Sequence, residues 1–224
     1  MDMDTFRSSP DGTVLPEWGR PPAGRLAGRV ARTTARKRRA GGGRPYSVAS
    51  GAAPLRTMGA MPTWTIAPEA PGSPAALALW RAYYTEVSDR WYLLHEGRRT
   101  DPGELEREIA AESGDILAPP HGRLLVARYG GEPAGTAGVR LLDAATAELK
   151  RVFLLPALRG RGGAALLVDA AERAARELGA ERIVLDTRSD LVEARALYAR
   201  LGYTETEPHN DDPYAEHWFG KRLT

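Results

Sequence analysis

The chain has 224 residues, of which 31 are Lys or Arg and 29 are Asp or Glu, so its formal net charge is +2. It contains no cysteine, which excludes a disulfide framework, a cysteine-ligated metal cluster and a thiol nucleophile. No apolar run approaches the roughly 20 residues that a membrane-spanning helix needs, and the first 61 residues lack the apolar core of a secretory signal. We therefore expect a cytoplasmic protein without a membrane partner.

The charge is unevenly distributed along the chain. Residues 1–61 hold 11 Lys and Arg against 4 Asp and Glu, whereas residues 62–224 hold 20 against 25. The first segment also contains 6 Pro and 9 Gly without a periodic apolar pattern, which predicts a disordered basic leader followed by one folded domain. Its basic cluster at 36–39 could contact nucleic acid, but Arg outnumbers Lys 28 to 3 in the whole chain. Such a bias indicates GC-rich coding, so we expect no nucleic-acid partner.

Strand and helix patterns alternate through residues 62–224. The period of the apolar residues predicts helices at 75–92, 102–112, 162–178 and 191–201, and strands at 63–67, 123–129, 134–142, 147–155, 182–187, 203–207 and 217–223. The pair Gly130-Gly131 between two strand patterns predicts a tight hairpin. On the third helix, Glu172/Arg176 and Arg173/Glu177 are spaced as ion pairs on its solvent side. Antiparallel strands followed by strand–helix–strand units indicate a mixed α/β fold.

The most informative stretch is an apolar strand followed by the turn Arg159-Gly160-Arg161-Gly162-Gly163-Ala164, which opens a helix. Glycines let several backbone N–H groups point toward one anion, and the N-terminus of the helix adds a partial positive charge. The turn is therefore predicted to bind a phosphate or pyrophosphate. It is not a P-loop, because no Lys-Ser/Thr pair follows at the required spacing.

The same turn also fits the dinucleotide fingerprint. Gly160, Gly162 and Ala165 have its spacing, and Asp186 follows Gly160 by 26 residues, near the distance expected of a ribose-binding acid. In the dinucleotide fold, however, the glycines follow the strand directly, whereas residues 156–159 intervene here. Only 38 residues remain after Asp186, too few to complete such a sheet with its crossover helices. The hypothesis of a nicotinamide-dependent oxidoreductase therefore rests on this match alone.

A second motif lies at 194–203 and reads Ala-Arg-Ala-Leu-Tyr-Ala-Arg-Leu-Gly-Tyr. It looks like A-x-x-LY-x-x-LGF/Y of the GNAT superfamily of acetyl-CoA-dependent N-acetyltransferases. The turn before it resembles the same family's coenzyme motif, Arg/Gln-x-x-Gly-x-Gly/Ala, with Arg159, Gly162 and Ala164 at the fixed positions. The chain departs from the family at Leu191, where an Asn is frequent, and at Gly163, where a bulky apolar residue is usual.

The resemblance spans about residues 63–224 and implies a GNAT-like fold. That fold has a central, mostly antiparallel sheet with one parallel pair splayed at the coenzyme site, flanked by helices. Acetyl-CoA would be the co-substrate: backbone groups near Phe153 and Leu154 would pair with its pantetheine arm. Its pyrophosphate would be held by the amides of Arg159, Gly160, Arg161, Gly162, Gly163 and Ala164.

The resemblance also implies two catalytic residues. Glu148 would accept the proton of the amine, directly or through a water, and Tyr198 would protonate the departing thiolate. The alternatives are a solvated carboxylate at a strand edge for Glu148 and a core aromatic for Tyr198. The aromatic first helix, with Tyr83, Tyr84, Trp91 and Tyr92, would help to wall the acceptor site.

The function implied by the resemblance is direct transfer of an acetyl group to a primary amine in a ternary complex. The acceptor would be a small molecule or a protein N-terminus or lysine, and a homodimer is one option for assembly. The alternative is a non-catalytic acyl-CoA-binding or regulatory module of the same fold. We expect no metal site, because His95, His121, His209 and His217 do not have metal-ligand spacing, and His217 is expected to be structural.

Overall fold

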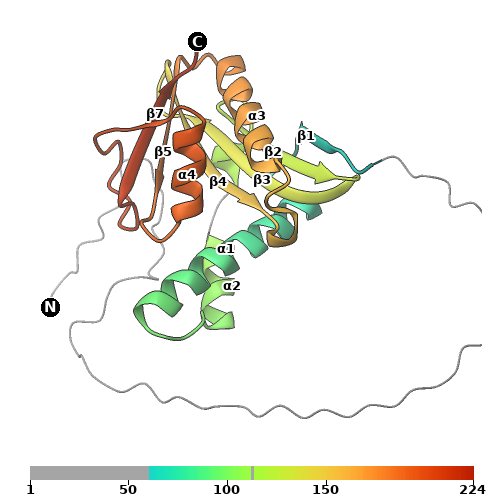
Figure 1. The fold of residues 1–224 in the computed structure, drawn as a ribbon, viewed down its shortest axis with the longest axis vertical. Helices are drawn as coiled ribbons and strands as arrows, with labels where there is room; N and C mark the ends of the chain where they lie inside the picture. Colours follow the sequence, from blue (N-terminus) through green and yellow to red (C-terminus); the bar gives the residue numbers. More distant parts are fainter. Residues whose placement is uncertain (1–60, 112–113) are drawn as a thin grey trace, which may run out of the picture. The chain divides into compact units, whose positions relative to one another are not determined.

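A computed structural model describes residues 61–111 and 114–224 (Figure 1). The predicted disordered leader, residues 1–61, lies outside these residues except for Met61. The folded part contains a seven-stranded sheet with the order β1-β2-β3-β4-β5-β7-β6. Its strands are β1 (Trp64–Pro68), β2 (Gly122–Tyr129), β3 (Glu132–Leu141), β4 (Thr146–Leu154), β5 (Arg182–Thr187), β6 (Thr204–Glu205) and β7 (His217–Arg222). All neighbouring strands in this sheet are antiparallel except β4 and β5, which are parallel, so the predicted fold class is confirmed.

Four α-helices accompany the sheet in the part of the chain that the structure describes. They are α1 (Pro74–His95), α2 (Pro102–Ala111), α3 (Gly163–Glu177) and α4 (Val192–Arg200), with short 3₁₀ turns η1 (Asp115–Leu117) and η2 (Pro156–Leu158). The predicted first helix is extended at both ends. Its start is fixed because the Ser73 side chain accepts a hydrogen bond from the Ala76 N–H at 3.1 Å and Pro74 occupies the first turn.

Two hydrophobic clusters lie on opposite faces of the sheet. Leu125 packs in the larger cluster with the apolar face of α3 and with Tyr198 of α4, whereas Leu124 packs in the smaller one with α1 and η1. Neighbouring residues of a strand point to opposite faces, so a strand that is covered on both sides has no polar face. This explains the uninterrupted apolar run at 124–127 in β2.

The predicted hairpin is formed by β2 and β3, with Tyr129 opposite Glu132. Its two linking residues, Gly130 and Gly131, have φ angles of 61° and 93°. A two-residue turn of this kind needs positive φ at both positions, and glycine adopts it without steric cost.

Two expectations need correction. The strand predicted at 203–207 is only the two residues of β6, because Tyr203 turns into the core and its N–H closes α4 on the Tyr198 carbonyl at 3.1 Å. Glu172 does not lie on the solvent side of α3. It is buried, and both its oxygens accept from Lys221 Nζ, at 2.7 and 2.9 Å, with Arg176 farther away at 3.8 Å. Arg173 forms its ion pair with Asp169, one turn earlier in α3, and not with the predicted Glu177.

Candidate active site

The glycine turn runs from η2 to the first residue of α3. Gly160 and Gly162 have φ angles of 74° and 79°, and a Cβ at either position would meet nothing within 4 Å. Glycine is therefore required here by the backbone conformation and not by packing. Left-handed residues next to right-handed ones make successive N–H groups converge, and the first four N–H groups of a helix have no partner within it. The turn thus presents a concave set of donors at the positive end of α3.

Arg159 is fixed between the end of β4 and α1. Its Nε donates to the Leu154 carbonyl at 3.0 Å, and its Nη2 donates to both carboxylate oxygens of Glu86, at 2.8 and 2.7 Å. The guanidinium carbon lies 5.7 Å from the centre of the Phe153 ring. These contacts connect the turn to the first helix and hold the guanidinium beside the end of β4.

The absence of a side chain at Gly163 is explained by a contact with Trp64, the first residue of β1. A Cβ on this residue would lie 2.4 Å from Trp64 Cζ2, closer than real Cβ atoms approach any neighbour. The same indole donates from Nε1 to the Arg161 carbonyl at 2.9 Å. Trp64 therefore fills the space that the bulky apolar residue usual in the resembled family would occupy. Its indole also holds the turn through the hydrogen bond to the backbone carbonyl of Arg161.

The parallel pairing of β4 and β5 ends early. Its register runs from Thr146 opposite Arg182 to Glu148 opposite Val184, although both strands continue. Beyond this point β4 bulges. Thr136 of β3 faces Phe153 while Gly138 faces Lys150, so two residues of β4 oppose one of β3.

The bulge contains Arg151, which has a φ of 54°. Its guanidinium carbon lies 4.5 Å from the centre of the Trp80 ring of α1. Phe153 and Leu154 follow, both buried and paired on one side to β3. On its other side β4 is not in register with β5 here, as expected for a splayed pair (Figure 1).

Glu148, the predicted proton acceptor, is not a solvated strand-edge residue. Its side chain is only 1% exposed, and it accepts from Arg140 Nε at 2.6 Å and from Lys150 Nζ at 3.3 Å. Burial alone would raise the pKa of this carboxyl group. The hydrogen bond from His209 and the charges of Lys150 and Arg140 outweigh burial and place the pKa well below its usual range. This environment thus favours the charged form of Glu148, and its part as proton acceptor stays a prediction.

Three further residues gather around Glu148 from β5 and from the loop before β7. His209 Nε2 lies 3.6 Å from Glu148 Oε1, and Asn210 Nδ2 donates to Asp186 Oδ1 at 2.9 Å. Ligating atoms of Glu148, Asp186 and His209 all lie within 4.8 Å of one another. Burial raises the pKa of Asp186, and the nearby carboxylates of Asp212 and Glu148 add to this, against the lowering effects of Lys150 and Asn210.

This cluster was missed by sequence reasoning, which treated Asp186 only as a ribose-binding acid and His209 only as a candidate ligand. Its members come from three segments, and no spacing along the chain relates them. Three such side chains could hold a cation in principle, but two cationic residues, Arg140 and Lys150, already neutralise the Glu148 carboxylate. The expected absence of a metal stays a prediction.

Tyr198 of α4 is buried, with its ring centre 5.7 Å from that of Tyr203 and 6.2 Å from that of Phe219. Burial raises its pKa strongly, and the neighbouring Tyr83 and Asp186 raise it further. The phenol is therefore protonated at neutral pH and able to donate. Asp186, a member of the Glu148 cluster, is thus one of the charges that favour the protonated phenol.

The aromatic residues of α1 divide between core and site. Tyr84, Trp91 and Tyr92 are buried, and Tyr84 belongs to the smaller hydrophobic cluster. Tyr83 is half-buried and lies edge-on to Phe153 of β4, with ring centres 6.0 Å apart. Of this group, Tyr83 is therefore the side chain that reaches the end of β4.

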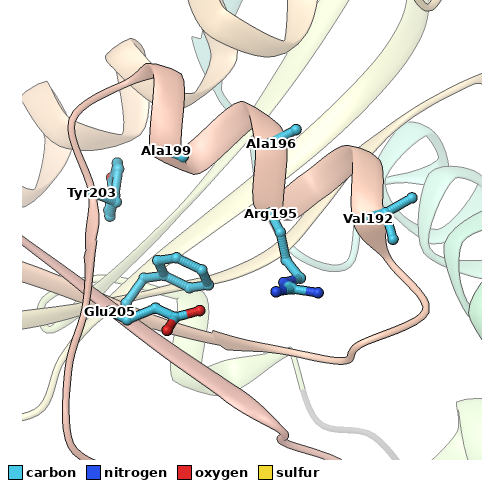
Figure 2. A pocket seen from close by; sticks show the side chains of 7 residues that line it. Val192, Arg195, Ala196, Ala199, Tyr203 and Glu205 are labelled. Atoms are coloured by element: carbon cyan, nitrogen blue, oxygen red, sulfur yellow. The ribbon is translucent and has the colours of Figure 1, made fainter.

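A groove of about 480 Å³ lies beside α4 (Figure 2). It is lined by residues of α4 and of the chain around β6 and β7: Val192, Arg195, Ala196, Ala199, Tyr203, Glu205 and Phe219. None of the predicted catalytic or coenzyme-binding residues is among them, although the rings of Tyr203 and Phe219 also pack against Tyr198.

Comparison with known proteins gives a consistent result. The sequence profile of the acetyltransferase (GNAT) family matches residues 79–203. The uncharacterized N-acetyltransferase YjgM of Escherichia coli is 41% identical over 81 residues, which are 35% of this chain and 48% of that protein. The uncharacterized N-acetyltransferase C1271.07c of Schizosaccharomyces pombe is 36% identical over 97 residues, 42% of this chain and 60% of that protein. The chain thus spans about half the length of the curated relatives it matches.

Solved structures share the fold. A Klebsiella pneumoniae protein assigned to the acyl-CoA N-acyltransferases is 25% identical, with a TM-score of 0.54 over 72% of this chain and 98% of that one. The PaiA N-acetyltransferase of Thermoplasma acidophilum, in complex with coenzyme A, has a TM-score of 0.54 at 15% identity, over 71% of this chain and 99% of that one. Within residues 61–111 and 114–224, no helix has the length and apolar character to cross a membrane.

Proposed function

Because this chain belongs to the GNAT acetyltransferase family, we propose that it transfers an acetyl group from acetyl-CoA to a primary amine, directly, in a ternary complex. One observation carries the proposal. The parallel pairing of β4 and β5 ends at Glu148, and β4 then leads into a turn of convergent amides. If β4 and β5 stayed paired, the N–H and C=O groups on this side of β4 would be hydrogen-bonded to β5. Where the pairing ends, those groups are available to an extended substrate arm.

The residues of this region fit the coenzyme. The amides from Arg159 to Ala164 and the N-terminus of α3 suit a pyrophosphate, and the side chain of Arg161 is exposed beside them. Backbone groups of β4 near Phe153 and Leu154, on the side away from β3, suit the amides of a pantetheine arm. Acetyl-CoA supplies a thioester whose carbonyl carbon is open to attack by an amine.

The chain's own residues would supply position and protons. An alkylamine is protonated at neutral pH, since its pKa is about 10, and it must lose a proton before it attacks. The buried phenol of Tyr198 has the protonation state needed to donate to the departing sulfur. Because the chain has no cysteine, a cysteine-bound acetyl intermediate is excluded, which favours direct transfer by positioning.

The acceptor is proposed only as a primary amine, of a small molecule or of a protein N-terminus or lysine. A non-catalytic acyl-CoA-binding module remains the alternative. A buried cluster of ionisable groups at the place where the β4–β5 pairing ends favours an enzyme, because titratable groups with shifted pKa values are typical of catalytic sites. The nicotinamide-dependent alternative is wrong on the fold, since the doubly wound sheet that it requires is parallel and only β4 and β5 are parallel in the sheet described here.

Two measurements test the proposal. Acetyl-CoA should raise the melting temperature of the protein, whereas NAD at the same concentration should not. Release of coenzyme A thiol should then be measured over a panel of polyamines, amino acids, aminoglycosides and peptides. Stabilisation by NAD alone would refute the coenzyme assignment, and stabilisation by acetyl-CoA without thiol release from any panel member would favour the binding module.

A further inference from the structure

The environment of Asn210 determines how the buried cluster is hydrogen-bonded. Trp218 Nε1 lies 3.0 Å from Asn210 Oδ1, and an indole nitrogen can only donate. The side-chain oxygen of Asn210 is therefore the atom that faces Trp218. Its nitrogen Nδ2 must face the other way, toward Asp186 Oδ1 at 2.9 Å and Glu148 Oε1 at 3.4 Å.

This arrangement decides which nitrogen of His209 carries the hydrogen. His209 Nε2 lies 3.4 Å from Asn210 Nδ2, but the two hydrogens of that amide are directed to the two carboxylates. The remaining neighbour of Nε2 is Glu148 Oε1 at 3.6 Å, which can only accept. Nε2 therefore carries a hydrogen that points toward the Glu148 carboxylate, and the neutral ring keeps its lone pair on Nδ1.

Nδ1 is buried and has no hydrogen-bond partner among the described residues. A buried polar atom without a partner destabilises the folded state, so such an atom needs an explanation. The cluster lies where the β4–β5 pairing ends, with Glu148 at the last paired position of β4. A substrate hydrogen is the partner that this position would provide.

We propose that His209, through Nδ1, accepts the proton that the acceptor amine loses, and that Glu148 and Asn210 are positioning residues for its ring. This inference rests on the proposed acetyl transfer. It reassigns the part expected of Glu148: the carboxylate stays charged, holds the tautomer through Nε2–H and stabilises the imidazolium.

The proton balance is complete with groups that are present. One proton passes from the ammonium group to Nδ1, and the free amine attacks the thioester carbonyl. A C–N bond forms, the C–S bond breaks, and the sulfur takes a proton from the Tyr198 hydroxyl. The nitrogen of the new amide loses its second proton to Tyr198, and His209 releases the first to solvent.

The charges around His209 come from every neighbouring element. Glu148 of β4 and Asp186 of β5 have carboxylate oxygens within 4.8 Å of its ring nitrogen, Asp212 acts electrostatically on Asp186, and Lys150 and Arg140 donate to Glu148. The carboxylates favour the imidazolium and the two cations oppose it.

The first test measures the tautomer and needs no substrate. The full chain is labelled with ¹⁵N-histidine, and long-range ¹H–¹⁵N spectra are recorded at pH 8, with His209→Gln identifying the signals of His209. We expect a hydrogen on Nε2 and none on Nδ1. A hydrogen on Nδ1 would overturn the assignment, whether or not acetyl transfer is found.

The second test uses acetyl-CoA and the panel amine that gives the fastest thiol release. In His209→Gln, kcat should fall about 100- to 1000-fold while KM for acetyl-CoA changes less than about 2-fold. The acidic limb of the pH profile should disappear, and imidazole should restore part of the rate in His209→Ala. The matched control is His217→Gln, since His217 is bonded to Ser189 and Glu205 outside the cluster.

The outcomes are separable. A His209→Gln enzyme that keeps more than half of the wild-type kcat, or an equal loss in His217→Gln, would overturn the part given to His209. Absence of thiol release in the wild type with every amine would instead count against the proposed function, and the tautomer measurement would then decide the inference alone.

Discussion

Replacing Gly163 with alanine tests how the coenzyme turn is supported. Helix propensity alone predicts a gain of up to about 1 kcal/mol, because Gly163 is the first residue of α3. The structure predicts the opposite. The new Cβ would lie 2.4, 2.6 and 2.7 Å from three ring carbons of Trp64, about 1 Å short of ordinary contact at 3.4 Å.

The cost follows from what the indole must give up. A shift of about 1 Å by a half-buried ring strains the packing by about 1–3 kcal/mol. The same shift lengthens or breaks the hydrogen bond from Trp64 Nε1 to the Arg161 carbonyl, which contributes about 1 kcal/mol to the free energy of unfolding. After the helix-propensity gain is subtracted, the net loss should be about 1–4 kcal/mol, or about 3–15 °C in melting temperature for a domain of this size. The affinity for acetyl-CoA should also fall, since the turn moves with Trp64.

Differential scanning calorimetry and acetyl-CoA titration measure both effects. The matched control is Gly103→Ala in the first turn of α2, where a Cβ would meet only side-chain ends at 3.2 and 3.7 Å, so stability should be unchanged or slightly higher. In a Trp64→Ala background, Gly163→Ala should cost little. An equal cost with and without the indole would refute the reasoning.

Three further predictions follow from buried groups. Tyr198→Phe should lower kcat about 10- to 100-fold and leave the Kd of acetyl-CoA, measured by calorimetry, nearly unchanged; an unchanged kcat would remove Tyr198 from the mechanism. Glu148 has a lowered pKa in the folded state, so its stabilising effect is present above its unfolded pKa of about 4.3 and is lost as the pH falls through the folded value. Urea denaturation should therefore show a larger stability gap between wild type and Glu148→Gln at pH 7 than at pH 3, and a gap that widens in acid would contradict this. Lys221→Met should destabilise the protein by about 1–3 kcal/mol, because buried Glu172 loses its nearest cation; Glu172→Leu in the same chain should restore most of that loss.

Much of the fold follows from local sequence. The four-residue apolar spacing in α1 and the alternation in the strands correctly predicted where elements occur, and Gly130-Gly131 fixed the hairpin through its backbone preference. Boundaries failed where tertiary packing decides. Tyrosine favours strands, and Tyr203 was therefore predicted to begin one. Its side chain is instead buried beside Tyr198, and β6 begins one residue later, at Thr204.

The site was predictable in its motifs and not in its contacts. The turn at 159–164 could be recognised because adjacent residues form it. The cluster of Glu148, Asp186 and His209 forms because β4 and β5 are neighbours and the loop before β7 returns to them. No spacing or periodicity in the sequence indicates that these three side chains lie close together. Burial also changed the chemistry of Glu148, since sequence shows a carboxylate but not the cations that lower its pKa.

The contact between Trp64 and Gly163 has a consequence for sequence variation. The two positions are 99 residues apart, yet they share one volume, so neither can change its size alone. A relative with a bulky residue at the start of the helix equivalent to α3 is expected to carry a small side chain in place of the indole. Substitutions at these two sites should therefore appear together, and that pairing would identify the relatives whose coenzyme turn is held in the same way.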